Sequence, residues 1–279
     1  MRMMASFAML FATALPVQAQ VQDGKVLSLG GAVTEIVVAL GQGDRLVARD
    51  STSTFPPEVL DLPDVGYVRA LSPEGVLSVE ADLILAEEGA GPPEVIDVIQ
   101  SADVVFVEVP DGFDGPGIAR KIETVGAALG LSERAQVLAG EVADALEAAS
   151  VPPGDAAPRV LFVLSASGGR IMASGRGTAA DAMIALAGGV NAIDAFEGYR
   201  QLGDEAVTRA APDVILMMDR EGDHAPGDDA LFALPAIAPT PAAQARAVIR
   251  MDGLRLLGFG PRTPEAVADL ARALHGAGG

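Results

Sequence analysis

Two series of alternating apolar and amphipathic segments, separated by one long helical pattern, constrain the fold of this chain more than any other feature. Short apolar runs alternate with stretches whose apolar residues recur at helical spacing. In the first series the pairs are 26–29 with 34–40, 83–85 with 93–100, and 104–107 with 118–129. Such alternation is typical of strands and helices that build a largely parallel sheet. We therefore predict an α/β lobe over residues 20–131.

The second series predicts another α/β lobe over residues 151–279. Its strand and helix segments are 160–164, 178–186, 214–218, 247–251 and 264–274. Between the lobes, residues 132–150 place their apolar side chains on one helical face, with Ser132 as the expected N-cap. Two prolines and a glycine at 152–154 end that helix. Because one helix makes a stiff connector, we expect little hinge closure between the lobes.

Residues 1–19 have the pattern of a secretory signal peptide. Arg2 precedes an apolar run over 3–15, and small residues before Ala19 fit a cleavage site. The run is shorter than the roughly 20 apolar residues that a membrane-spanning helix needs. We expect export to the periplasm with cleavage near Ala19.

The charge and the lack of cysteine exclude several classes of function. The chain has no Cys, which excludes disulfides and thiolate metal sites. Its formal net charge is −19, which repels nucleic acid and anionic membrane surfaces. We expect a monomer whose partners are small molecules or basic protein surfaces, and no nucleic acid.

The common enzyme templates find little support. The two histidines are His224, in a loop rich in Gly, Asp and Pro, and His275, near the C-terminus, and neither fits a catalytic triad. The turns at 30–31 and 175–178 complete neither a dinucleotide fingerprint nor a phosphate loop, so each is either a structural turn or an anion site at a helix start. A serine hydrolase would have to use the stretch 165–169, which lacks a positioned base. We therefore expect that this protein is not an enzyme.

The two lobes share an internal echo. In each lobe a Gly-Tyr pair is followed by a Glu and, eight residues after that Glu, by an Asp that opens an apolar strand. The echoed residues are Tyr67, Glu74 and Asp82 in the first lobe and Tyr199, Glu205 and Asp213 in the second. Each Glu lies at a helix start, where the helix dipole favours an acid. The alternative is that the two Glu side chains form a symmetric acidic pair on one face.

Tyr67 is the candidate iron ligand. In an extended stretch residues i and i+2 share a face, so Arg69 can lie beside the Tyr67 phenol oxygen. A phenol, with a pKa of about 10, needs a cation or a ferric ion beside it to ionise at neutral pH. Phenolate is a hard anionic ligand that suits Fe(III) in haem. The alternative is an ordinary half-buried tyrosine with an arginine stacked on it.

Several stretches closely resemble the periplasmic haem-binding proteins of bacterial haem ABC importers, which belong to the class III substrate-binding proteins. These stretches are 26–31, 46–53, 66–75, 173–178, 197–200 and 256–262. The resemblance implies two Rossmann-like α/β lobes joined by a single long helix, with a ligand cleft between them. It implies that Tyr67 captures ferric haem b as an axial tyrosinate and that the protein delivers the haem to an ABC permease and its ATPase.

The resemblance also assigns roles to other residues. Arg69 corresponds to the arginine that hydrogen-bonds the axial tyrosine, and Glu74 and Glu205 fall where related proteins dock on the permease. The candidates for holding the haem propionates in the second lobe are Arg170, Arg176 and Arg200.

The second lobe also bears on the coordination of the iron. Tyr199 can approach the other haem face or pack at the lobe edge. Some family members add a histidine ligand from the second lobe, but segments 165–174 and 196–202 contain none, so we expect a five-coordinate iron. The sequence leaves open whether one haem or two stacked haems bind. The alternative ligands on the same fold are a siderophore and cobalamin.

Overall fold

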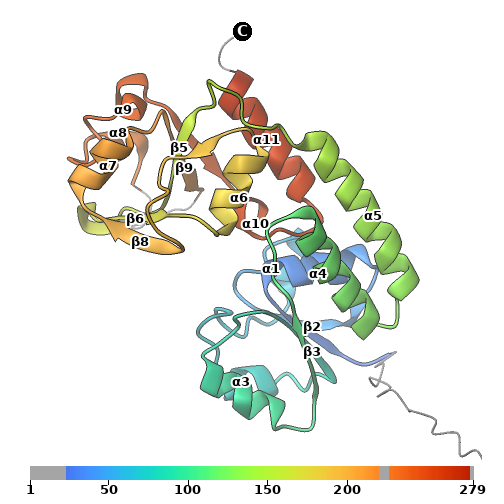
Figure 1. The fold of residues 1–279 in the computed structure, drawn as a ribbon. Coiled ribbons are helices and arrows are strands. Elements are labelled where there is room, and N and C mark those ends of the chain that lie inside the picture. The colour runs from blue at the N-terminus through green and yellow to red at the C-terminus, as the bar shows by residue number, and fades with distance from the viewer. Residues whose placement is uncertain (1–22, 220–225, 277–279) are drawn as a thin grey trace, which may run out of the picture.

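The computed structural model describes residues 23–219 and 226–276, which form two α/β lobes bridged by one long helix (Figure 1). Both predicted lobes are therefore present, although their exact boundaries stay a prediction. The expected signal segment and His224 lie outside the described residues. Within the described ranges, no helix combines the length and the apolarity that a membrane span requires.

A four-stranded parallel sheet in the order β2-β1-β3-β4 forms the first lobe. Its strands are almost entirely apolar because helices cover both faces of such a sheet. The strands are β1 (Val26–Leu29), β2 (Leu46–Arg49), β3 (Leu83–Glu87) and β4 (Val105–Val109). The helices are α1 (Gly31–Ala39), α2 (Pro73–Leu77), α3 (Pro93–Gln100) and α4 (Gly115–Ala128), with short 3₁₀ turns η1 (Gly43–Arg45) and η2 (Pro57–Asp61).

The second lobe contains a mixed sheet in the order β10-β9-β5-β6-β8, with β7 pairing with β5. Strands β5, β9 and β10 are parallel, whereas β6 runs antiparallel to β5 and β8. The strands are β5 (Arg159–Ser165), β6 (Ile171–Ser174), β7 (Val190–Asn191), β8 (Tyr199–Leu202), β9 (Val214–Met218) and β10 (Val248–Met251). The helical elements are η3 (Ser167–Gly169), α6 (Ala179–Leu186), α7 (Asp204–Ala210), α8 (Asp228–Phe232), α9 (Pro241–Ala245), α10 (Gly253–Leu257) and α11 (Thr263–His275).

Helix α5 (Ser132–Ala149) connects the lobes and runs beside α4 and α11 (Figure 1). Its buried face consists of Ala135, Ala139, Val142 and Leu146, as the apolar spacing predicted. The expected N-cap was wrong by one residue, because Leu131 is the cap and Ser132 is already helical.

One hydrophobic core extends through both lobes. The cluster includes Val26 of β1 and Phe162 of β5, together with residues of α4, α5, α6 and α11. The segment after β10 returns to the first lobe, where the Phe259 ring meets Phe113 edge-on at 5.3 Å between centroids. Close-packed interiors resist shear, and little hinge closure stays a prediction.

The internal echo has a structural cause that the sequence did not reveal. Asp82 accepts a hydrogen bond from the Lys25 backbone N–H at 2.7 Å, and its own N–H donates to the Lys25 carbonyl at 2.9 Å. Asp213 makes the same pair of bonds with Arg159. Its carboxylate accepts from the Arg159 N–H at 2.9 Å, and its own N–H donates to the Arg159 carbonyl at 2.8 Å. Each echoed Asp therefore joins the strand it opens to the start of the first strand of its lobe.

A fully buried carboxylate, Asp50, links the turn after β1 to the loop after β2. Its Oδ1 accepts from the Gly30 N–H at 2.9 Å and the Ser53 hydroxyl at 2.7 Å. Its Oδ2 accepts from the backbone N–H and the hydroxyl of Thr52 at 2.9 and 2.6 Å. The Thr52 hydroxyl oxygen in turn accepts from the Gly31 N–H at 3.1 Å. Because protein groups satisfy these N–H donors, the turn at 30–31 is structural.

We predict that Asp50→Asn lowers the free energy of unfolding by about 3 kcal/mol, because the new amide group faces donors that lose their acceptor in a buried site. Urea denaturation measures this loss. The matched control is Asp61→Asn at an exposed position of the same loop, which should change stability by less than about 0.5 kcal/mol. Equal midpoints for the two variants would contradict the role assigned to Asp50.

Candidate functional site

Arg49 holds the loop that carries Tyr67. This nearly buried arginine donates from Nε to the Val59 carbonyl at 3.0 Å and from Nη1 to the Asp64 carboxylate at 3.1 Å. The loop also runs beside the end of β2, where the Ser51 N–H donates to the Gly66 carbonyl at 2.9 Å. The segment with the Ala-Arg-Asp-Ser-Thr pattern therefore fixes the position from which Tyr67 projects.

Tyr67 is an exposed tyrosine, with half of its surface open to solvent. Its backbone carbonyl accepts from the Ala70 N–H at 2.8 Å, which closes a tight turn. Within the described residues its phenol hydroxyl has no hydrogen-bond partner. Among the described residues, no arginine stacks on the Tyr67 ring, so the alternative of a tyrosine covered by an arginine is wrong.

The structure shows no hydrogen bond between Arg69 and the Tyr67 phenol among the described residues. The prediction assumed an extended stretch, but residues 67–70 form a turn. The exposed Arg69 guanidinium donates instead to the Gly89 carbonyl at 3.0 Å, across the turn that follows β3.

Tyr199 opens β8 and brings the second lobe opposite these residues. Its ring meets Phe162 edge-on, with 6.4 Å between centroids. Burial raises the pKa of the Tyr199 phenol, against hydrogen bonds from Thr178 and Ala180 at the start of α6. Arg69 and Asp111 of the first lobe also influence this pKa, so the two lobes face each other here.

Glu87, at the end of β3, was missed by the sequence reasoning. Its carboxylate lies so close to the Gly30 backbone that a Cβ atom at Gly30 would be 2.4 Å from Oε2. Burial raises the pKa of the Glu87 carboxyl to about 7, although Lys121 opposes the shift. An acid at the end of an otherwise apolar parallel strand was the available signal. We call Tyr67, Arg69, Glu87, Asp111 and Tyr199 the interlobe site.

Lys121 of α4 binds the carboxylate of Asp111, a residue of this site. The lysine side chain has no exposed surface, and its Nζ donates to the Asp111 carboxylate at 2.9 Å and the Gly258 carbonyl at 3.2 Å. A second ion pair, between Arg262 and the buried Glu35, joins the same returning segment to α1. The stretch 256–262 therefore serves the junction of the lobes.

The three candidate propionate-binding arginines do not form one cluster. Arg176 is exposed and makes a loose ion pair with Glu197 at 3.8 Å. The Arg200 guanidinium lies over Phe196, 5.1 Å from the ring centroid, and Arg200 points to the opposite face of β8 from Tyr199 because adjacent strand residues alternate. Arg170 is exposed at the turn before β6.

The two echoed glutamates lie where the cap analysis placed them. Ser72 caps α2 by accepting from the Gly75 N–H at 3.1 Å, and Glu74 lies exposed in the first turn. Gly203 precedes α7, and Glu205 is exposed in its first turn with an ion pair to Arg209.

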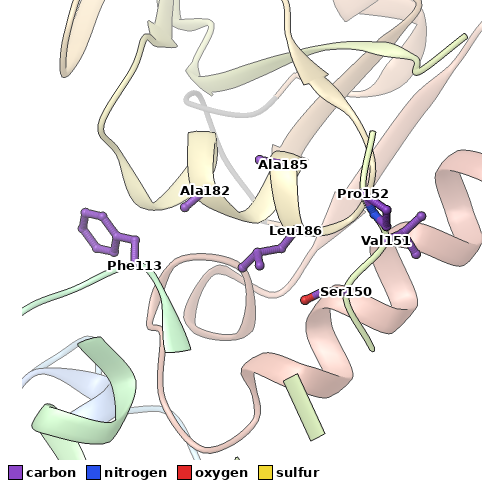
Figure 2. A pocket seen from close by; sticks show the side chains of 7 residues that line it. All are labelled: Phe113, Ser150, Val151, Pro152, Ala182, Ala185 and Leu186. Carbon is purple, nitrogen blue, oxygen red and sulfur yellow. The ribbon is translucent and has the colours of Figure 1, made fainter. Parts of the chain in front are cut away.

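A separate apolar pocket of about 420 Å³ lies on the side where α5 ends (Figure 2). Phe113 lines it together with residues of α6 and the chain after α5. Its lining contains no side chain suited to ligate ferric iron, so it is not the candidate site.

Metal-binding clusters offer no alternative. In the described part of the chain, no group of three or more His, Cys, Asp or Glu side chains could hold a metal ion. The His275 ring nitrogen Nε2 lies 3.0 Å from the Ala187 carbonyl and so has a structural partner.

Comparisons with known proteins agree on one kind of protein. A family model described as periplasmic binding protein matches residues 26–253. An uncharacterised ABC transporter substrate-binding lipoprotein of Bacillus subtilis, YvrC, is 28% identical over 90% of this chain and 80% of its own length. The vitamin B12-binding protein of Pectobacterium atrosepticum is 26% identical over 69% of this chain and 71% of its own length.

Two solved structures are more similar in sequence. The periplasmic haem-binding protein BhuT in complex with two haems has 41% identity and a TM-score of 0.85, covering 91% of this chain and 98% of that one. The periplasmic haem-binding protein RhuT from Roseiflexus sp. RS-1, in its apo form, has 39% identity, the same TM-score and the same coverage. The predicted fold of two lobes is confirmed by this likeness.

The raised pKa of Glu87 predicts a stability trend with pH. The folded state disfavours the ionised carboxyl, so stability falls as pH rises from the pKa of about 4.5 in the unfolded chain to about 7 in the fold. Glu87→Gln should therefore raise the melting temperature at pH 8, with a gain that shrinks towards pH 5. Thermal melts across this range measure the trend, with Glu108→Gln at an exposed position of the adjacent strand β4 as control. A gain that does not change with pH would contradict the assignment.

Proposed function

The chain belongs to the periplasmic binding protein family, and from that premise we propose that it captures ferric haem b between its lobes and delivers it to an ABC permease and its ATPase. As a member of this family it is a substrate-binding protein and not an enzyme. The observation that carries the haem proposal is the exposed Tyr67 phenol, which lacks a hydrogen-bond partner within the described residues and lies on the loop two residues before Arg69 of the interlobe site.

Tyr67 is the proposed axial ligand. Ferric iron is a hard cation that binds the phenolate oxygen in place of its proton, so the tyrosinate forms when haem binds. Arg69 is exposed, and surface side chains change rotamer within nanoseconds, so its guanidinium can leave the Gly89 carbonyl and donate to the tyrosinate. We retain Arg69 as a supporting residue on this basis.

The second lobe supplies the proposed contacts to the rest of the haem. Tyr199 faces the first lobe and can lie against the porphyrin. Arg176 is the strongest of the propionate candidates, because its ion pair to Glu197 is loose and it precedes the helix start beside Tyr199. Arg170 is exposed. Arg200 lies on the face of β8 opposite Tyr199 and is the weakest candidate.

Export and docking complete the proposal. The apolar segment at 1–19 directs a monomer to the periplasm, where cleavage occurs near Ala19. Glu74 and Glu205 start matched helices in the two lobes, and both are exposed. We propose that each enters a basic pocket on one half of the permease.

Cobalamin is the second candidate ligand, because a vitamin B12-binding protein is 26% identical over two thirds of the chain. Haem requires an axial ligand from this protein, whereas cobalamin already carries its own lower ligand. A dependence of binding on the Tyr67 oxygen therefore separates the two ligands.

We predict that wild-type protein titrated with ferric haem develops a saturable high-spin spectrum that Tyr67→Phe loses, because the only change is removal of the ligand oxygen. The affinity of Tyr67→Phe should fall by more than about tenfold, or about 1.4 kcal/mol. Tyr199→Phe is the matched control and should keep the spectrum. If all three proteins give the same spectrum, Tyr67 is not the ligand.

The same titration tests the number of haems. We expect a break at one equivalent for a five-coordinate single site. Because BhuT binds two haems in its complex, the titration is continued past two equivalents. A break at two would replace the single-site expectation, and saturable binding of cobalamin in the absence of haem binding would replace haem as the ligand.

We predict that Glu74→Lys and Glu205→Lys each abolish haem uptake into vesicles that contain the cognate permease and ATPase, while haem affinity stays unchanged. Reversal of charge repels the proposed basic pockets. Glu94→Lys is the matched control, because Glu94 is also exposed after a proline in the first turn of a helix, α3. Full uptake by both variants would exclude these glutamates from docking.

A further inference from the structure

Glu87 is a carboxylate of the interlobe site whose role neither the ligand nor the docking proposal explains. It ends β3, lies partly buried against the Gly30 backbone, and has no side-chain hydrogen bond to any described residue. We propose that Glu87 takes up a proton when haem enters the interlobe site, so that haem binding is coupled to the protonation of this carboxyl. This inference rests on the proposed haem function.

Lys121 and Arg69 favour the ionised form of Glu87 by their charge, but neither donates a hydrogen bond to its carboxylate. Lys121 of α4 is committed to the Asp111 carboxylate and the Gly258 carbonyl. Arg69, from the loop after Tyr67, donates to the Gly89 carbonyl. Asp111, after β4, and Asp50, after β2, both oppose ionisation of Glu87 by their own charge. These four groups are the ones that influence Glu87, and none of them is a hydrogen-bond partner.

Haem shifts this balance in one direction. Its two propionates and the Tyr67 tyrosinate add negative charge, which exceeds the single positive charge of the ferric porphyrin centre. The porphyrin also displaces water from the site, and loss of water disfavours an ionised carboxylate. Both effects favour the neutral acid. Because the pKa of Glu87 is already raised to about 7, with burial as the largest cause, a modest further rise leaves the carboxyl protonated above neutral pH.

The coupling has a sign that can be measured. Above pH 7 the empty protein must recover a proton for Glu87 before haem binds, so affinity falls as pH rises. Glu87→Gln mimics the neutral acid and removes this cost. The comparison of variants isolates Glu87, because the ionisation of Tyr67 and the titration of free haem are common to both proteins.

The experiment measures the dissociation constant of ferric haem from pH 6 to pH 9 for wild type, Glu87→Gln and Glu108→Gln. We expect wild type to lose affinity relative to Glu87→Gln by up to about tenfold per pH unit above pH 7. Glu108→Gln removes the same charge from an exposed position of the adjacent strand β4 and should follow wild type. A ratio between wild type and Glu87→Gln that is constant with pH overturns the proposal. Weaker binding by Glu87→Gln at every pH also overturns it and identifies a direct contact.

A second measurement does not depend on how well the variant folds. Infrared difference spectra of wild type, ¹³C-labelled at its Glu side-chain carboxyls, are recorded at pH 8 before and after haem addition. The label separates protein carboxyls from the haem propionates. A new signal of a protonated, labelled carboxyl is expected, and its absence with haem bound overturns the proposal. If haem does not bind wild type at all, the proposed function fails first; if haem binds without the signal, only the coupling fails.

Discussion

The buried charge of Asp50 organises the first lobe around the candidate site. A carboxylate without solvent is tolerated only when hydrogen-bond donors surround it, and four donors from Gly30, Thr52 and Ser53 do so. Two segments that lie twenty residues apart in the sequence are thereby fixed to each other. Arg49, the preceding residue, then fixes the loop that ends at Tyr67. The position of the phenol is therefore set by this polar network together with Val68, the next residue, which is buried in the apolar core of the lobe.

The elements that the sequence predicted are those whose burial leaves a periodic pattern. The parallel strands have continuous apolar runs, and α5 keeps its apolar residues on one face. Strand β8 left no such pattern, because it lies at the edge of its sheet and exposes three of its four residues. The helix starts at Ser72 and Gly203 were predictable because capping depends on neighbouring residues alone.

The candidate site shows where local reasoning ends. Tyr67 could be singled out from its sequence context, and its exposure agrees with a role towards a ligand. The orientation of Arg69 could not be predicted, because it depends on a turn that a left-handed Gly66, with φ of 101°, introduces just before Tyr67. Burial raises the pKa of Glu87, Asp111 raises it further, and Lys121 lowers it. These residues come from segments that meet only in the folded chain. No periodicity within a single segment encodes that environment.

The hydrophobic cluster that runs through both lobes has a consequence for the proposed transport cycle. A binding protein whose lobes share a packed hydrophobic cluster changes shape little when its ligand binds. The shapes of its empty and loaded forms are then nearly the same. A membrane permease that recognised only the shape of the protein would bind the empty and loaded forms equally well. The empty form would then act as a competitive inhibitor of uptake. Discrimination between the empty and loaded forms must therefore depend on direct contact with the ligand, or on surface charges that ligand binding changes.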